Sequence, residues 1–293
     1  MKKDIIISIG EILWDIFPNG KKLGGAPANF AYIISQFNLN SCIVSAIGND
    51  KLGEEILQNL KEKKLNYLAD IIDYPTGTVL VELDKEGVPQ YTIKQNVAWD
   101  NIPYNKELTD LLKNCKAICF GTLAQRDEIS RNTILRSLEQ VALNVNSLRI
   151  FDINLRQSFY NKEIILTSLK LCNILKLNNQ ELNILTELLE IKETNFKQVC
   201  DKIIKQYNLK ILILTCGTDG SYVFIQNNYS YLPTPQVDVE DTVGAGDAFT
   251  AAFVASIIKG ETIIQAHQIA VKTSAYICTQ AGAMINIPKE IIS

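Results

Sequence analysis

Short continuous runs of apolar residues recur along the chain, separated by stretches in which apolar positions have helical spacing. A run without polar alternation is typical of a strand that is buried on both faces of a parallel sheet. Such strands are predicted at 5–9, 42–47, 117–120, 149–153, 174–177 and 211–215, and helices at 54–64, 129–141, 247–259 and 262–279. This alternation predicts an α/β fold with a mostly parallel sheet flanked by helices.

Two predicted hairpins interrupt the alternation. The first joins 78–83 to 89–95 through Asp84-Lys85-Glu86-Gly87, and the second joins 222–226 to 229–232 at the sheet edge. A hairpin inserted into a parallel chain is either a flap over the site or a decoration of the sheet edge, and the pattern leaves both open. Because there is no internal repeat or long linker, residues 1–293 are interpreted as one domain with a flap.

The composition is that of an ordinary globular protein. The 293 residues are 47% hydrophobic and 21% charged with a net charge of −3, and Lys and Arg form no basic stripe, which argues against nucleic acid as a partner. No apolar run approaches about 18 residues, so no membrane span is expected. Seven Cys without a Cys-x-x-Cys pair argue against zinc and a disulfide framework, and favour a reducing cytoplasm. His267, the only histidine, has polar neighbours and is expected at the surface.

The most informative stretch is Asp-Thr-Val-Gly-Ala-Gly-Asp-Ala-Phe-Thr-Ala-Ala-Phe at 241–253. Gly244 and Gly246 precede a predicted helix, and the free N–H groups of a helix start bind phosphate or another anion. A carboxylate would repel that anion, so Asp247 makes chemical sense as a base that removes a proton from an attacking hydroxyl. The alternative is an ordinary N-cap aspartate.

Polar residues at strand ends supply further candidates. Asp15 lies just beyond the first strand, at the sheet edge where ligands bind in open α/β folds. Asn29 is expected one turn into a helix after Gly24-Gly25, where it can hydrogen-bond a polyhydroxyl ligand or simply face solvent. Asp50 is interpreted as a helix cap.

Two later segments carry similar groups. Alternation along an extended backbone is expected to place Asp152, Asn154 and Arg156 on one side, and Arg156 suits a phosphate or a lid carboxylate. Asn178 and Glu181 can hold Mg²⁺ through its waters, or form a capping pair at a helix start.

Together these motifs resemble the ribokinase-like (PfkB) sugar kinases over essentially the full chain. The two main signatures are Gly24-Gly25-Ala26-Pro27-Ala28-Asn29 and Asp241-Thr242-Val243-Gly244-Ala245-Gly246-Asp247. Between and around them, in the family's order, stand Gly10-Glu11 with Asp15, Ile47-Gly48-Asn49-Asp50 with Gly53, Asp152 through Arg156, Asn178 through Glu181, and Thr215 through Gly220. The Gly-Glu opening, the Gly-Gly-Ala-Pro-Ala-Asn form and Val97-Ala98-Trp99-Asp100 look most like bacterial fructokinases.

The resemblance implies ATP-dependent phosphorylation of a sugar hydroxyl, with fructose as the expected sugar, on a doubly wound sheet with a small β-sheet lid at about 11–23 and 73–98. It implies Asp247 as general base and the amides of Gly244, Ala245 and Gly246 as an anion hole. Sugar contacts are implied for Asp15, Gly24, Gly25, Asn29, Asn154 and Arg156, and nucleotide contacts for Asn178, Glu181, Thr215, Gly217 and Gly220. Glu181 is implied in water-mediated Mg²⁺ binding, and Asp241, Val243, Gly282 and Asn286 as neighbours of a monovalent cation such as K⁺.

Departures and alternatives remain. Val243 stands where many relatives have Thr, and Ala26-Pro27 replaces the Lys-Gly of ribokinases proper, which argues against ribose. Another sugar, a nucleoside, or sugar binding without catalysis are the competing functions. A nicotinamide-dependent dehydrogenase and a P-loop kinase are disfavoured because neither glycine motif is present. A homodimer through exposed lid edges is a further expectation.

Overall fold

A nine-stranded sheet forms the centre of the protein, whose computed structural model describes residues 4–83, 89–226 and 228–292. Its strands are β1 (Ile5–Ile9), β4 (Ser41–Gly48), β5 (Asn66–Ile72), β8 (Cys115–Phe120), β9 (Leu148–Asp152), β10 (Ile174–Asn178), β11 (Ile211–Thr215), β12 (Ser221–Ile225) and β13 (Asn228–Leu232). The order is β13-β12-β11-β10-β9-β8-β1-β4-β5. Only the β11–β12 and β12–β13 pairs are antiparallel, so the six predicted strands and the edge hairpin are confirmed.

The strand order reverses between β1 and β8. From β1 the chain proceeds through β4 to β5 in one direction, whereas β8 to β13 follow one another in the other direction. At such a switch point the loops after the two central strands diverge to opposite faces and leave a crevice beyond the carboxyl edge. The segments after β1 and β8 therefore line the crevice of this sheet.

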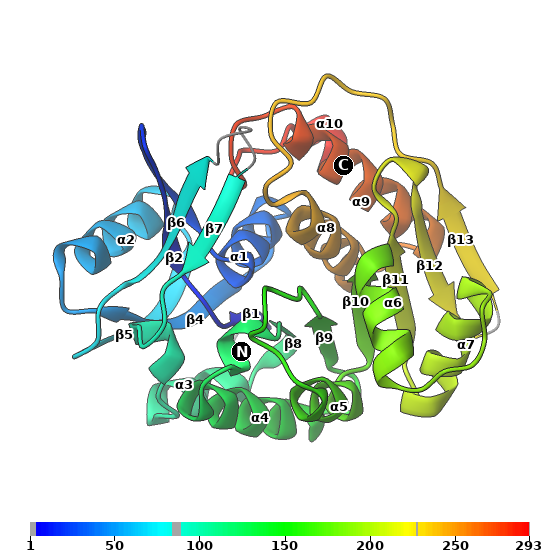
Figure 1. Ribbon diagram of the computed structural model, residues 1–293, viewed down its shortest axis with the longest axis horizontal. Helices are drawn as coiled ribbons and strands as arrows, with labels where there is room; N and C mark the ends of the chain where they lie inside the picture. The colour runs from blue at the N-terminus through cyan, green and yellow to red at the C-terminus, as the bar shows by residue number, and fades with distance from the viewer. Residues whose placement is uncertain (1–3, 84–88, 227, 293) are drawn as a thin grey trace.

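Helices cover both faces (Figure 1). One face carries α1 (Ala26–Gln36), α2 (Lys51–Glu62), α8 (Ala245–Lys259) and α9 (Ile263–Cys278), and the other carries α3 (Lys106–Leu112), α4 (Glu128–Ala142), α5 (Lys162–Leu171), α6 (Asn179–Leu188) and α7 (Phe196–Tyr207). The short α10 (Lys289–Ile292) packs near α9. Helix α8 is buried from Ala248 to Ser256, because α1 and α9 pack against it as well as the sheet.

A separate four-stranded sheet has the order β3-β2-β6-β7. Its strands are β2 (Leu13–Phe17), β3 (Gly20–Gly24), β6 (Gly77–Leu83) and β7 (Pro89–Ile93). In Figure 1 it stands to one side of α1 and α8, with β10–β13 on the other side. The predicted 78–95 hairpin is confirmed as β6–β7, while its turn lies outside the described residues.

The base of the small sheet is fastened to the main body by Arg126. Its guanidinium lies 2.7 and 2.8 Å from the two oxygens of Asp100, and its Nη2 donates to the Lys94 carbonyl at 2.6 Å. The same group stacks over the Trp99 ring at 4.0 Å. A buried, bidentate pair of this kind fixes orientation as well as charge.

Some local predictions fare differently. Asp50 is the N-cap of α2, with its side chain accepting from the Gly53 amide at 2.9 Å, as predicted. The surface placement of His267 is wrong: the ring is fully buried, hydrogen-bonded to Ser221 and Ser230 at 2.8 and 2.9 Å. Burial lowers its pKa to about 4, so the ring is neutral.

All seven cysteines are free, and five of them are buried. The five buried thiols pack as small hydrophobic side chains. In the described parts of the chain, no helix combines the length and the apolar character that crossing a membrane requires.

Candidate active site

Helix α8 begins at the predicted glycine motif. Gly244 is its N-cap with a left-handed φ of 78°, and a Cβ added there would overlap Ala283. The position therefore needs glycine. Because Gly244 has no side chain, no N-cap group covers the first amides of α8. Asp247 lies in the first turn and not at the cap, so the alternative of an N-cap aspartate is wrong.

The carboxylate of Asp247 is held by α1. Asn29 Nδ2 donates to Asp247 Oδ2 at 2.8 Å, which joins the two predicted signatures across 218 residues of sequence. Burial, and after it the carboxylate of Asp152, raises the pKa of Asp247 to about 6, although Asn29, Lys176 and Arg156 oppose these effects. The group is thus ionised at neutral pH, yet basic enough to accept a proton.

Lys176 lies beneath this helix start and was missed by sequence reasoning. Its Nζ is 3.1 Å from Asp152 Oδ1, and Asp152 also accepts from Thr250 at 3.0 Å. A Cβ on Gly246 would lie 3.1 Å from the same ammonium, so the glycine gives the turn room to approach Lys176 closely. Burial alone would lower the pKa of Lys176, but Asp152, Glu181 and Asp247 outweigh it and raise the pKa. A buried cation therefore lies next to the glycine backbone at the start of α8.

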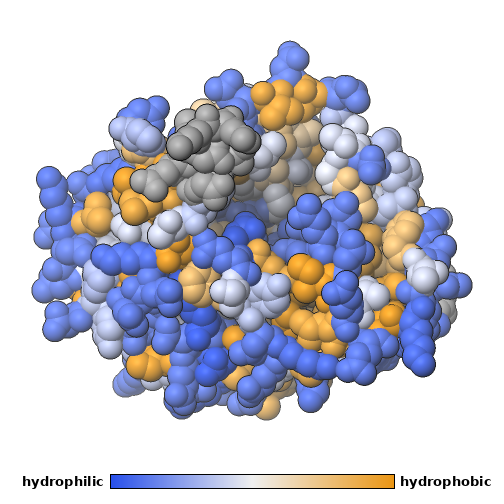
Figure 2. Space-filling view, viewed as in Figure 1, coloured by the Kyte–Doolittle hydropathy of each residue, from blue (hydrophilic) through white to orange (hydrophobic). Residues whose placement is uncertain are grey.

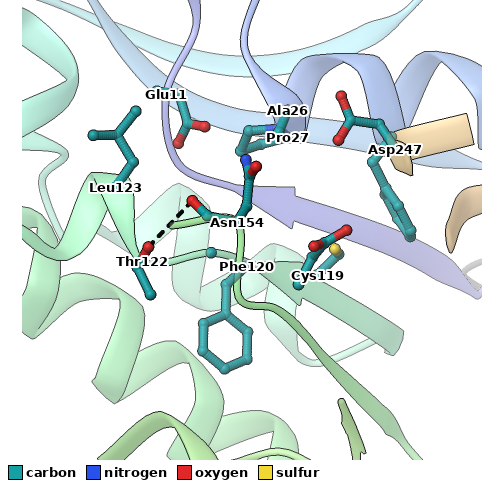
Figure 3. Close-up of a pocket in the computed structure, with 12 residues that line it drawn as sticks. Glu11, Ala26, Pro27, Cys119, Phe120, Thr122, Leu123, Asn154 and Asp247 are labelled. Carbon is teal, nitrogen blue, oxygen red and sulfur yellow. Dashed lines mark hydrogen bonds between the residues drawn. The ribbon is translucent and has the colours of Figure 1, made fainter. Parts of the chain in front are cut away.

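A small cavity of about 20 Å³ lies beside Asp247. Its walls come from the ends of β1 and β8, the start of α1 and the loop after β9, which is the switch point of the sheet. Figure 3 shows Glu11 and Asp247 directed into this space, on either side of Ala26 and Pro27, with Asn154 facing them. Besides the half-buried Asp247, the buried carboxyl groups of Glu11 and Asp152 line this cavity, and no role was predicted for Glu11 from the sequence. The sequence signal that could have identified Glu11 is a charged residue two positions after a buried strand.

Asp15 lies on β2 of the small sheet, where its neighbours in register are Lys22 and Val79. Burial raises the pKa of its carboxyl group to about 6, although Arg156 and Lys22 oppose the rise. Gly24 ends β3 against the Asp15 side chain, and Gly25 caps α1 next to the Glu11 carbonyl. The small sheet therefore brings a carboxyl group toward the same side as Asp247, and Figure 2 shows the surface hollowed between this sheet and the main body.

The predicted extended segment after β9 is not extended. The strand ends at Asp152, and Asn154 has a left-handed φ of 42°, so simple alternation does not set the side chains. The prediction that alternation places Asp152, Asn154 and Arg156 on one side of an extended backbone is therefore wrong. Even so, Asp152 and Asn154 both line the cavity, and Arg156 interacts electrostatically with Glu11, Asp15 and Asp247.

Asn178 and Glu181 form the capping pair that the spacing allowed. Asn178 Oδ1 accepts from the Glu181 amide at 2.9 Å, and Glu181 Oε2 accepts from the Asn178 amide at 2.8 Å. Glu181 Oε1 also accepts from the Leu155 amide at 2.9 Å. Each oxygen accepts one backbone hydrogen bond, and because a carboxylate oxygen can accept two, this fixed carboxylate can also accept from a metal-bound water. Among the described residues there is no cluster of His, Cys, Asp or Glu that would bind a metal directly.

The predicted nucleotide turn follows β11. Asn178 and Thr215 are partners in register, so the capping pair and the turn begin at the same level of the sheet. Gly217 and Gly220 have φ values of 57° and 110°, and the Cys216 amide closes the turn on the Gly220 carbonyl at 2.8 Å. This places Thr215, Gly217 and Gly220 at the carboxyl edge.

Three of the four predicted cation neighbours meet at Asp241. Its carboxylate accepts from the amides of Val243 and Gly282 at 3.0 and 3.1 Å, and Lys22 Nζ lies 3.4 Å away. The side chain of Asn286 instead accepts from the Tyr32 hydroxyl at 2.8 Å.

Comparison with known proteins decides the family. Residues 17–290 match the model of the pfkB family of carbohydrate kinases. The chain belongs to this family. It is therefore a sugar kinase, and the expected ribokinase-like fold is confirmed by solved neighbours.

Two relatives of this pfkB-family kinase differ in their activity. An ATP-dependent 6-phosphofructokinase of Thermoanaerobacterium thermosaccharolyticum is 28% identical, covering 98% of this chain and 92% of the relative. Fructokinase-1 of Zea mays is 25% identical, covering 98% and 96%. A fructokinase from Xylella fastidiosa, solved with bound ATP, superposes with a TM-score of 0.88 at 18% identity, covering 99% and 97%. The superposition establishes the fold, but identities this low do not identify the sugar.

Proposed function

We propose that this pfkB-family enzyme transfers the γ-phosphoryl group of ATP to a hydroxyl of a free monosaccharide, with fructose as the first candidate. The observation that carries the proposal is the Asp247 carboxylate, fixed by Asn29 at 2.8 Å, in the first turn of a helix whose start is bare glycine backbone. A base and an anion site in contact are what transfer to an alcohol requires.

In the proposed reaction, a sugar hydroxyl lies against Asp247 and gives its proton to that carboxylate. The sugar oxygen then attacks the γ-phosphorus, the bond from that phosphorus to the bridging oxygen breaks, and ADP leaves. The amides around Gly244, Ala245 and Gly246 stabilise the charge on the transferring group. Asp15, Asn29, Asn154 and Arg156 orient the sugar. Positioning and electrostatics supply most of the rate enhancement in such transfers.

The nucleotide is assigned to the opposite end of the site, at Thr215, Gly217 and Gly220. Mg²⁺, held through water by Glu181, would neutralise phosphate charge when bound. For a monovalent cation, Asp241 with the Val243 and Gly282 backbone is the proposed place. Lys22 already contributes a positive charge 3.4 Å from Asp241.

The decisive test is ADP release over a panel of free sugars, sugar phosphates and nucleosides, comparing wild type with Asp247→Asn. We expect fructose to give the highest kcat/KM, and the variant to lose about 10²- to 10⁴-fold in kcat, because general-base catalysis contributes that much. ATP binding, measured by calorimetry, should be retained. A variant with near wild-type kcat would contradict Asp247 as the base.

A sugar phosphate is the second candidate substrate. Arg156 is an exposed cation close to Asp15, and a relative acts as a 6-phosphofructokinase. Turnover of fructose 6-phosphate well above fructose would select this candidate. Sugar binding without any ADP release would instead indicate a non-catalytic relative.

We also propose a homodimer formed through the small sheet, in the cytoplasm. Leu80 and Tyr91 of this sheet are 46% and 52% exposed, and β3 and β7 are its outer strands among the described residues. Unpaired outer strands next to apolar side chains are suited to pairing with a second copy. If wild type sediments as a dimer and Leu80→Lys sediments as a monomer, this interface is supported.

A further inference from the structure

Glu11 is a buried carboxyl group with an unused oxygen. The residue is 4% exposed, and its Oε2 has no hydrogen-bond partner in the described structure. Leaving a buried polar atom unpaired costs stability, so such atoms call for an explanation. Here the residue lies in the wall of the 20 Å³ cavity next to Asp247.

The place of the cavity favours a ligand. It lies between the ends of β1 and β8, where the strand order reverses and where open α/β sheets bind their ligands. Figure 3 shows the Glu11 side chain reaching this cavity from the segment after β1, alongside the start of α1. The cavity is about the size of one water or one hydroxyl group.

The surrounding chemistry favours a neutral hydroxyl over an anionic group. Asp247 and Asp152 share the cavity with Glu11, so an anionic ligand group would be repelled. Pro27, Phe30 and Leu123 supply apolar walls that offer no hydrogen bond to a second polar group. A carboxyl oxygen can accept from an alcohol, and a protonated carboxyl group can donate to one.

We propose that Glu11 is a specificity-determining residue that hydrogen-bonds a second hydroxyl of the sugar, distinct from the one that Asp247 deprotonates. This rests on the proposed function, since the sugar must already lie against Asp247. The carboxyl groups divide the work: Asp247 acts on the reacting oxygen and Glu11 selects sugars that carry a neighbouring, unsubstituted hydroxyl.

A structural role is the alternative, because the Ala26 amide at the start of α1 also interacts with the Glu11 carboxyl group. The two roles predict opposite stability effects. Replacing a capping carboxylate lowers the melting temperature, whereas replacing an unpaired buried carboxyl group with an apolar side chain of similar shape leaves it unchanged or raises it.

The test compares wild type, Glu11→Met, Glu11→Gln and Ser8→Ala. Ser8 is the matched control, because its hydroxyl is also buried and unpartnered on β1 but does not line the cavity. KM and kcat are measured for the best sugar of the panel, for its single-deoxy analogues and for ATP. Melting temperature is measured for every variant.

We expect Glu11→Met to raise KM for the sugar by roughly 10- to 100-fold, the worth of a hydrogen bond to a charged group, with KM for ATP unchanged. For the deoxy analogue that lacks the hydroxyl bound by Glu11, KM should be the same in Glu11→Met as in wild type. Ser8→Ala should have wild-type KM values. Glu11→Gln should keep part of the affinity.

Three outcomes would overturn the inference. An unchanged sugar KM in Glu11→Met with an active wild type removes Glu11 from sugar recognition and leaves the proposed function intact. If Glu11→Met raises KM by the same factor for the sugar and for every deoxy analogue, and also lowers the melting temperature, Glu11 is a capping residue. A wild type that turns over no sugar in the panel overturns the proposed function, and the Glu11 assignment falls with it.

Discussion

Two helix starts meet at the site, and each has a carboxyl group beside it. Helix α8 starts at Gly244 and carries Asp247 in its own first turn, whereas α1 starts at Gly25 without an acidic residue and has Glu11 brought to it from the end of β1. Burial raises the pKa of both groups, to about 6 for Asp247 and about 7 for Glu11. They differ in their partners.

Asp247 is supported on several sides, by the Asn29 amide at 2.8 Å and by the charge of Lys176 below, whereas one oxygen of Glu11 has no partner within the described residues. Support of this kind holds a base in one orientation and keeps it ionised. An unpaired oxygen is instead free to bind an incoming group. The comparison teaches that similar carboxyl groups at similar helix starts acquire different roles from their neighbours.

The largest effect is expected from removing the cation below α8. Lys176→Met leaves Asp152 buried and uncompensated next to Asp247, and breaking a buried pair typically costs about 3–5 kcal/mol. Lower stability in urea unfolding and a large loss of kcat should follow. The double variant Asp152→Asn/Lys176→Met removes both charges and should recover much of the stability. If the double variant is no more stable than Lys176→Met, the uncompensated charge of Asp152 is not the cause of the lost stability.

Asn29→Ala tests the link between the two helices. The hydrogen bond from Asn29 lowers the pKa of Asp247, so its removal should raise that pKa above about 6. The acid limb of the kcat profile, which rises as the base ionises, should then move to higher pH, with roughly a tenfold loss at pH 6 and a smaller loss at pH 8. Asn29→Asp, which adds a like charge, should move the limb further. A uniform loss at every pH would instead indicate a role in sugar binding alone.

Six strands of the main sheet were predictable because they are continuous apolar runs, which periodicity detects without knowledge of their neighbours. Strand β5 was not predicted, because it carries polar residues and is only partly buried. Periodicity did not detect strands β2 and β3, because they are short and partly exposed and β3 carries Lys21 and Lys22; only the family resemblance implied a β-sheet there. Within the site, Asn29 and Asp247 were found from glycine-rich motifs, since glycine next to a helix start is a local signal.

Residues whose role depends on a distant partner were missed. Lys176 stands within an apolar strand, and only its register opposite Asp152 on β9 explains the charge. His267 has polar sequence neighbours, but its ring is buried against Ser221 and Ser230 of the β12–β13 hairpin. Register and tertiary packing decide such cases, and no periodicity within one segment encodes them.

The smallest effect concerns pH and stability at the two carboxyl groups. Each has a folded-state pKa above its ordinary value, from 3.8 to about 6 for Asp247 and from 4.5 to about 7 for Glu11. Between those values the folded state binds more protons than the unfolded state, so each group makes the protein less stable as pH rises through its window. Asp247→Asn and Glu11→Gln should therefore gain stability relative to wild type on going from pH 4 to pH 8, with most of the gain complete near pH 6 for Asp247→Asn and near pH 7 for Glu11→Gln. His267 acts with the opposite sign, since its lowered pKa makes the fold lose stability as pH falls from 6.5 toward about 4. That contribution is common to all three proteins and cancels in the difference between variant and wild type.

Urea unfolding at several pH values gives the difference directly, and a difference that is constant from pH 4 to pH 8 would show that these carboxyl groups are not desolvated in the folded protein.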